Sequence, residues 1–453
     1  MRLALAVGAV SVAACMAAAA GVGVRSTRGS QVGVDEPQYL LSAMSLAEDG
    51  DLDIADELAA ERWRTFHETQ LPQQTRLLPD GRRVSPHDPL LALLLVPGVV
   101  TAGWVGAKLT LALLAGVLAG LLTWTAVHRL DVGVPVAAGV VAVFVLSAPL
   151  AVYGNQVYPE LPAALAVTVA ITALAGRLSS ATALAVASAV VALPWLSVKY
   201  VPVAATLAAL ALSRLWRSGQ RRPAAVMAIA LVAAGCVFAV VHLVVYTGLT
   251  PYAAGDHFTG GELTVAGTAP DLLGRSQRLL GLLVDRTFGL AAWQPAWLLA
   301  VPAVGWLLRS RHQQWPVLVA PLAVGWLNAT FIALTMHGYW FPGRQVVVVL
   351  PAAVLAVAVW AQQWRPARGM AAVLGVLGVS SYAWLVHDGL RGHLTWVTDF
   401  WQVSDPWYQA WSALLPAYLH ATTLTWLAHG LWLVAAVVAG AWSWRRAAVS
   451  RSP

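Results

Sequence analysis

Long apolar stretches separated by short polar segments run through almost the whole chain. An apolar run of about 20 residues crosses a membrane as a helix, because a helix satisfies its own backbone hydrogen bonds inside the hydrocarbon core. The pattern therefore predicts an all-α polytopic membrane protein, a bundle of about twelve transmembrane helices. The expected spans are residues 4–24, 102–127, 133–150, 161–176, 180–197, 199–215, 223–247, 289–308, 316–336, 346–363, 369–386 and 423–444. The apolar segment 89–100 ends at Pro97-Gly98 and is too short to span, so we expect an interfacial or re-entrant piece there.

The charges orient these spans. Arginines in short loops and tails mark the cytoplasmic side by the positive-inside rule, and this places both termini in the cytoplasm. All 21 acidic residues except Asp131 then fall on the opposite side. The outer segments are a long first loop at 25–88, a short loop at 151–160, a loop at 248–288 that we expect to be mobile, and a late loop at 387–422.

Composition supports one membrane domain over residues 1–453. The chain is 59% hydrophobic and 11% charged, with a net charge of +7, whereas a soluble domain carries roughly 25% charged residues. The positive charge comes from arginines at helix ends, so it does not indicate nucleic-acid binding. Cys15 and Cys236 lie in apolar runs, which argues against a disulfide framework. The residue usage is typical of a GC-rich genome and suggests an actinobacterial source.

The first outer loop carries a candidate site. Asp35 precedes Glu36-Pro37, and proline is favoured in the first turn of a helix, so Asp35 is expected to cap an interfacial helix that stops at Asp49-Gly50. A second amphipathic piece is expected over residues 54–66. Asp35 and Glu36 have two interpretations, an N-terminal cap and a catalytic carboxylate. A carboxylate suits catalysis because an attacking hydroxyl must lose its proton.

Here the sequence resembles the GT-C glycosyltransferases, in particular the protein O-mannosyltransferases and the lipid A aminoarabinose transferase type. The first match is an Asp-Glu pair that opens an interfacial helix, with a Gly-Asp at its end. Three further segments follow in the family order and in the expected topology. The matching segments are Asp35-Glu36-x-x-Tyr39 with Gly50-Asp51, Ser85-Pro86-His87-Asp88-Pro89-Leu90, Tyr158-Pro159-Glu160 and Phe341-Pro342-Gly343-Arg344.

The resemblance implies an integral-membrane enzyme of the plasma membrane that passes a sugar from a polyprenyl-phosphate carrier to a hydroxyl acceptor by inverting displacement. The acceptor would be a glycan, lipid or protein on the extracytoplasmic face, in cell-envelope assembly. Actinobacterial cell walls contain arabinan and mannan, and this context suggests arabinose or mannose as the sugar. Asp35 would be the base, and Glu36 would orient the base or the acceptor, although their roles could be exchanged. Glu160 would be the second-loop acid. Residues expected to contact or orient the acceptor are Tyr39, His87, Asp88 and Tyr158.

One position departs from the family pattern. The lysine that contacts the lipid phosphate in the aminoarabinose enzymes is Asp88 here, and a carboxylate cannot stabilise a phosphate leaving group. Fixed cations must face the charge that develops on that group. We expect Arg344, Lys199 and Arg286, which lie at outer helix ends, to supply them. The alternative for each is a side chain that only reaches the membrane interface.

Two further alternatives remain open. Asp35, Asp88 and Glu160 offer hard oxygen ligands that would favour Ca²⁺ or Mg²⁺, although no spacing in the sequence demands a metal. A transporter or flippase of a lipid-linked sugar would need charged or broken-helix features near the middle of the membrane, and the expected spans carry few charges there. A polymerase that uses the same donor is not distinguished from the transferase by the sequence.

Overall fold

A computed structural model gives the fold, and it describes residues 1–258 and 260–449. In the described residues the regular structure is helical, apart from isolated β-bridges between loops. The longer helices are α1 (Arg2–Ala20), α4 (Leu90–Leu130), α5 (Val134–Val145), α7 (Glu160–Ala175), α8 (Ser180–Leu196), α9 (Val201–Arg217), α10 (Arg221–Tyr246), α14 (Ala300–Ser310), α15 (Trp315–Leu327), α16 (Leu350–Gln363), α17 (Arg365–Leu390) and α19 (Thr423–Val449).

The described helices establish a multi-pass membrane protein. Seven of them are long and apolar enough to cross a membrane: Arg2–Ala20, Leu90–Leu130, Val198–Arg217, Arg221–Ala254, Trp315–Ile332, Arg365–Leu390 and Thr423–Ala447. Shorter apolar helices occupy four other expected positions: Val134–Val145, Glu160–Ala175, Ser180–Leu196 and Val347–Gln363. The expected span 289–308 is instead broken into α13 (Leu290–Trp293), a 3-10 turn (Pro295–Leu299) and α14. The break occurs because Gln294 has an extended conformation and Pro295 follows it. The exact count of twelve spans stays a prediction.

Helix α4 is divided by a kink at Ala102-Gly103, where Gly103 has a positive φ of 56°. The segment before the kink is therefore a separate helical piece, as the sequence pattern of residues 89–100 predicts. After the kink, α4 packs closely against α1. A Cβ added at Gly116 would lie 2.9 Å from the carbonyl oxygen of Ser11. Glycine at this position permits the close approach of the two helices.

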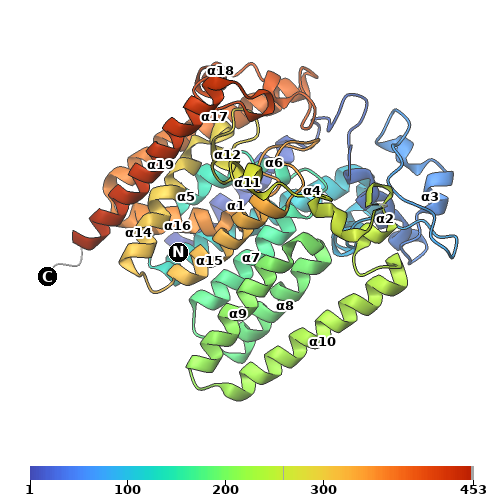
Figure 1. Cartoon of the computed structure of the whole chain (residues 1–453), viewed down its shortest axis with the longest axis horizontal. Coiled ribbons are helices and arrows are strands. Elements are labelled where there is room, and N and C mark those ends of the chain that lie inside the picture. Colours follow the sequence, from blue (N-terminus) through green and yellow to red (C-terminus); the bar gives the residue numbers. More distant parts are fainter. Residues whose placement is uncertain (259, 450–453) are drawn as a thin grey trace.

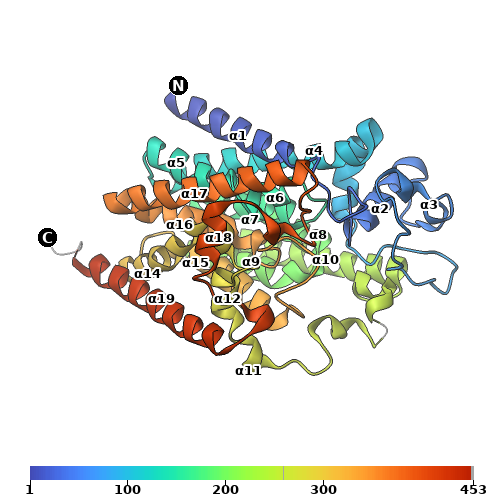
Figure 2. The same cartoon turned by 90° about the horizontal axis from the view of Figure 1, so that it is seen from above.

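The first outer loop forms α2 (Glu36–Glu48), α3 (Ala55–Ala59) and a 3-10 turn (Arg62–Thr65). The expected start and end of α2 are confirmed. Every residue from Glu36 to Ser45 is buried, so α2 is not an open interfacial helix. It packs on α4 and is covered by other loops. Figures 1 and 2 both place α2 and α3 together at one end of the molecule, beyond the ends of the long helices.

The loop after α10 packs against this first loop. It contains 3-10 turns at Pro251–Ala254, Asp256–Phe258 and Glu262–Ala266, then α11 (Leu272–Arg275) and α12 (Arg278–Val284). Backbone hydrogen bonds join the two loops, from Arg76 N–H to Ala254 and from Asp256 N–H to Gln74. The remaining short helices are α6 (Leu150–Tyr153) and α18 (Pro406–Ser412). The loops thus form one layer over an end of the bundle, and this layer positions the candidate site.

Candidate active site

Asp35 lies immediately before α2, and Pro37 stands in the first turn of the helix. The expected side-chain cap is wrong, because the Asp35 carboxylate accepts no hydrogen bond from the first turn. It is instead bound by Arg344, whose Nη2 lies 2.8 Å from Asp35 Oδ2. Burial alone would raise the pKa of Asp35, but the charges of Arg344 and Lys199 outweigh it and hold this pKa below its usual value. The carboxylate is therefore ionised at neutral pH.

Arg344 bridges two acids from different loops. Its Nε donates to Glu160 Oε1 at 3.1 Å, while Nη2 holds Asp35. The guanidinium carbon lies 4.2 Å from the centre of the Tyr158 ring, and the residue is only 9% exposed. Gly343 makes this placement possible. It has a φ of 88°, and a Cβ there would lie 2.9 Å from Pro149 Cγ.

Lys199 completes a chain of four alternating charges. Glu160 is the first residue of α7 and is fully buried, with Lys199 Nζ 2.7 Å from its Oε1. Lys199 lies in a 3-10 turn (Val198–Tyr200) between α8 and α9. Positive and negative side chains alternate in the order Lys199, Glu160, Arg344 and Asp35, so each charge lies beside one of opposite sign. This order also leaves two cations side by side around a single carboxylate oxygen, an arrangement that can accept an anion.

Asp88 is directed away from this chain of charges. Its Oδ1 lies 3.0 Å from His242 Nε2, and its Oδ2 accepts the Val198 N–H at 2.9 Å. The other ring nitrogen of His242 faces the carbonyl of Phe238 at 2.8 Å, so it must be the donor there. Asp88 thus anchors the backbone turn that carries Lys199, a role that sequence reasoning did not anticipate. A histidine inside an apolar run was the available signal.

Tyr39 and His87 form the adjoining wall. Their rings stack with centroids 4.5 Å apart, and Tyr246 donates to the carbonyl of His87 at 2.9 Å. Burial lowers the pKa of His87 to about 4, with Asp35 opposing and Arg344 reinforcing the shift. His87 is therefore neutral at pH 7 and can exchange a hydrogen bond with a ligand without adding charge.

Glu36 has a different environment from Asp35. It is fully buried and accepts hydrogen bonds from Ser26 Oγ at 2.6 Å, Gly33 N–H at 3.1 Å and Val157 N–H at 2.7 Å. Lys108, whose Nζ is 2.9 Å from the Gln31 carbonyl, adds a positive charge nearby. Glu36 therefore ties the first outer loop to the second loop, and its contacts are with the protein scaffold.

Several buried polar atoms of this cluster have no hydrogen-bond partner. Since buried polar groups are almost always paired, these atoms are available to a ligand. They are Glu160 Oε2, His87 Nε2, Tyr158 Oη and Tyr200 Oη.

Arg286 does not contact these charged side chains. Its guanidinium donates to the carbonyls of Ser412 and Ala413, at 3.0 and 3.2 Å. It lines a separate cavity of about 660 Å³ with Asp285 and Trp401. The structure therefore separates Arg286 from Arg344 and Lys199, with which the sequence grouped it.

The expected cation ligands also have other partners. Asp35 is bound by Arg344, Glu160 by Arg344 and Lys199, and Asp88 by His242. Within the described ranges, the carboxylates that lie close enough to share an ion are those of Asp49, Asp56 and Glu57.

This architecture is a helical, multi-pass membrane fold. The chain is structurally similar to ArnT from Cupriavidus metallidurans, solved bound to undecaprenyl phosphate. The TM-score is 0.54 with 13% sequence identity, and the match covers 97% of this chain and 73% of ArnT. The predicted fold is thereby confirmed as similar to that of ArnT. No protein-family model and no curated protein sequence matches the chain. The actinobacterial source stays a prediction.

Proposed function

We propose that this protein transfers a sugar from a polyprenyl-phosphate carrier to a hydroxyl acceptor at the extracytoplasmic membrane surface. The observation that carries the proposal is the position of Arg344, which holds Asp35 at 2.8 Å and Glu160 at 3.1 Å while Lys199 holds the same Glu160 oxygen. A base and two cations therefore lie together. The GT-C fold, with undecaprenyl phosphate bound in ArnT, supports a polyprenyl-phosphate donor.

The reaction would be an inverting displacement. The acceptor oxygen attacks the anomeric carbon, the bond from that carbon to the phosphate oxygen breaks, and the acceptor proton passes to Asp35. The polyprenyl phosphate leaves with one more negative charge. Arg344 and Lys199 would stabilise that charge, and the planar guanidinium of Arg344 suits phosphate.

Binding of the donor would also prepare the base. In the free protein the Arg344 charge depresses the pKa of Asp35, which makes the carboxylate a weak base. A donor phosphate that draws the guanidinium toward itself would relieve this effect, since an opposite charge lowers a carboxyl pKa only while it stays close. Base strength would therefore rise when a donor is present.

Neighbouring groups take supporting roles in this proposal. Tyr39 and His87 would orient the acceptor hydroxyl, and Tyr158 would keep Arg344 in place by its ring contact at 4.2 Å. Glu160 would hold the two cations together, and Glu36 would fix the start of α2. No step in this mechanism needs a metal ion.

The test is transfer by the purified full-length protein from a panel of synthetic polyprenyl-phosphate sugars, including arabinose and mannose donors. Release of polyprenyl phosphate by the wild-type protein, and its loss in Asp35→Asn, would establish the transferase class and name the sugar. Asp80→Asn is the matched control, because Asp80 is an exposed acid of the same loop that pairs with Arg82. If the folded protein releases no polyprenyl phosphate but moves a lipid-linked sugar across vesicle membranes, the protein is a transporter and not a transferase.

A further inference from the structure

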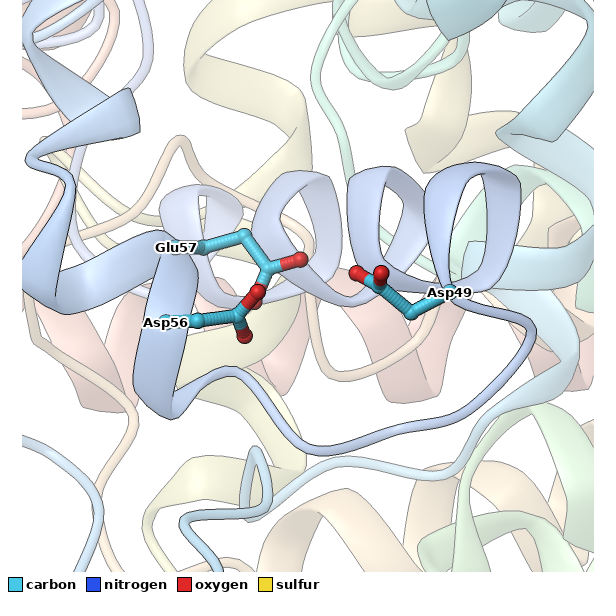
Figure 3. A group of neighbouring side chains, drawn as sticks. All are labelled: Asp49, Asp56 and Glu57. Atoms are coloured by element: carbon cyan, nitrogen blue, oxygen red, sulfur yellow. The ribbon is translucent and has the colours of Figure 1, made fainter.

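Three carboxylates converge in the loop between α2 and α3. Asp49 caps the C-terminal end of α2, Gly50 follows with a φ of 78°, and Asp56 and Glu57 lie in the first turn of α3. The turn brings the three side chains together, and one ligating oxygen of each lies within 4.8 Å of the others. Figure 3 shows the carboxylates of Asp49 and Glu57 directed toward one another, with that of Asp56 beside Glu57.

Glu57 distinguishes this group from an ordinary acidic surface. The residue is only 2% exposed, and no donor reaches either of its carboxylate oxygens. An unpaired buried carboxylate is strongly unfavourable, so a compensating positive charge or a proton is required. A single shared proton would still leave two negative charges in the group.

The nearby cations direct their hydrogen bonds to other partners. Arg62 directs both of its terminal nitrogens to Glu48, at 2.7 and 2.6 Å, and Arg83 donates to the carbonyl of Thr75. The other acids of the loop are also engaged. Asp51 accepts from Ser45 and from the Asp53 N–H.

Asp53, for its part, accepts the backbone N–H groups of Ala55 and Arg83. Asp51 and Asp53 therefore shape the backbone of the loop. Asp49, Asp56 and Glu57 remain as carboxylates that face one another without a protein cation between them.

We propose that Asp49, Asp56 and Glu57 bind one calcium ion. Carboxylate oxygens are hard ligands, and Ca²⁺ takes them at about 2.3–2.6 Å in flexible geometry, so opposite ligands can lie about 5 Å apart. The observed separations fit this range. Mg²⁺ demands a near-ideal octahedron at about 2.0–2.1 Å, which suits a loop site less well. Asp49 and Asp56 are exposed, so the ion could reach the site from solvent, and Glu57 would bind it from the buried side.

The ion would fasten the helix that carries the candidate base. Asp35 precedes the first residue of α2, and Asp49 follows its last residue. An ion that joins Asp49 to α3 would fix one end of α2 while Arg344 holds the other. The site lies apart from the charged chain around Arg344, so calcium binding is independent of whether the protein transfers a sugar.

The test uses full-length protein in detergent, stripped with a chelator and titrated with Ca²⁺ by calorimetry, with Tb³⁺ luminescence as a second probe. We expect one site per chain and a rise of the thermal midpoint with Ca²⁺. Loss of a group that only supports a metal ligand commonly weakens metal affinity by about 10–100-fold. Asp56→Asn and Glu57→Gln each change a ligand itself, so we expect at least this loss of Ca²⁺ affinity. Asp80→Asn should bind as the wild-type protein does.

The outcomes separate the alternatives. Since Glu57 is buried, Glu57→Gln can fail to fold, whereas Asp49→Asn and Asp56→Asn alter exposed residues and keep the test decisive. Absence of Ca²⁺ binding to the wild-type protein would overturn the proposal in favour of a shared proton. Equal binding by wild-type protein and Asp56→Asn, or displacement of Ca²⁺ by equimolar Mg²⁺, would overturn it as well.

Discussion

Arg344 Nη2 lies 2.8 Å from Asp35 Oδ2, although 309 residues separate the two in the chain. The contact joins the first outer loop to the segment between α15 and α16, and Glu160 shares the same guanidinium. The candidate base and the cation that binds it thus come from segments far apart in the sequence. The arrangement makes distinct predictions for each partner.

The Arg344 side chain should be irreplaceable by lysine. A lysine keeps the charge but has no planar fork, so it cannot hold Asp35 and Glu160 in the same way. Loss of one preorganised group that stabilises developing charge costs about 10²–10³ in kcat, and we expect this loss in Arg344→Lys, measured as polyprenyl phosphate release. Arg286→Lys is the control, because Arg286 serves only backbone carbonyls. An equal loss in both variants would contradict the assignment.

Changing Asp35 to asparagine should mainly slow transfer, whereas changing the neighbouring Glu36 to glutamine should mainly lower stability. Asp35→Asn removes the base, and we expect about 10²–10⁴-fold slower transfer with little change in thermal midpoint. Glu36→Gln disturbs a buried carboxylate bound by Ser26, Gly33 and Val157. We expect it to destabilise the protein by about 1–3 kcal/mol, read as a lower midpoint of unfolding. The reverse pattern would exchange their roles.

Stability should depend on pH through His87. Its pKa falls from 6.5 to about 4 in the folded protein, so the unfolded chain binds more protons between these values. The contribution of His87 to stability should therefore decrease as the pH falls from 6.5 toward 4, and this contribution should change little below that window. His87→Gln should flatten this part of the curve in thermal unfolding measured from pH 7 to pH 4. An unchanged slope in the variant would show that another group titrates.

Introducing at position 88 the lysine of the aminoarabinose enzymes that the sequence resembles should harm the protein. In Asp88→Lys the contact with His242 Nε2 and the hydrogen bond from Val198 N–H would both be lost. We expect lower thermal stability and weaker transfer, because the turn that carries Lys199 loses its anchor. Asp88→Asn keeps an acceptor for Val198 and should be milder. Higher activity in Asp88→Lys would instead indicate that position 88 faces the donor phosphate.

Local sequence patterns determined much of the architecture. Apolar runs of spanning length predicted the multi-pass helical bundle, because each such run must satisfy its backbone within itself. Pro37 and Asp49-Gly50 predicted the bounds of α2, since both signals act on adjacent residues. Asp35 and Arg344 were expected to act together on the strength of the family resemblance, and the structure brings them into contact.

Tertiary structure decided what depends on distant partners. Asp35 and Glu36 are adjacent acids in the sequence, yet they have different partners. Asp35 accepts a hydrogen bond from Arg344, whereas Glu36 accepts one from the backbone of the second loop. His242 pairs with Asp88 across 154 residues, and no local pattern encodes that pairing. The sequence alone thus established a helical membrane protein with candidate acids and cations. Only the packing of the loops over the helix ends decided which charges meet, because charge pairing depends on distance in space rather than on position along the chain.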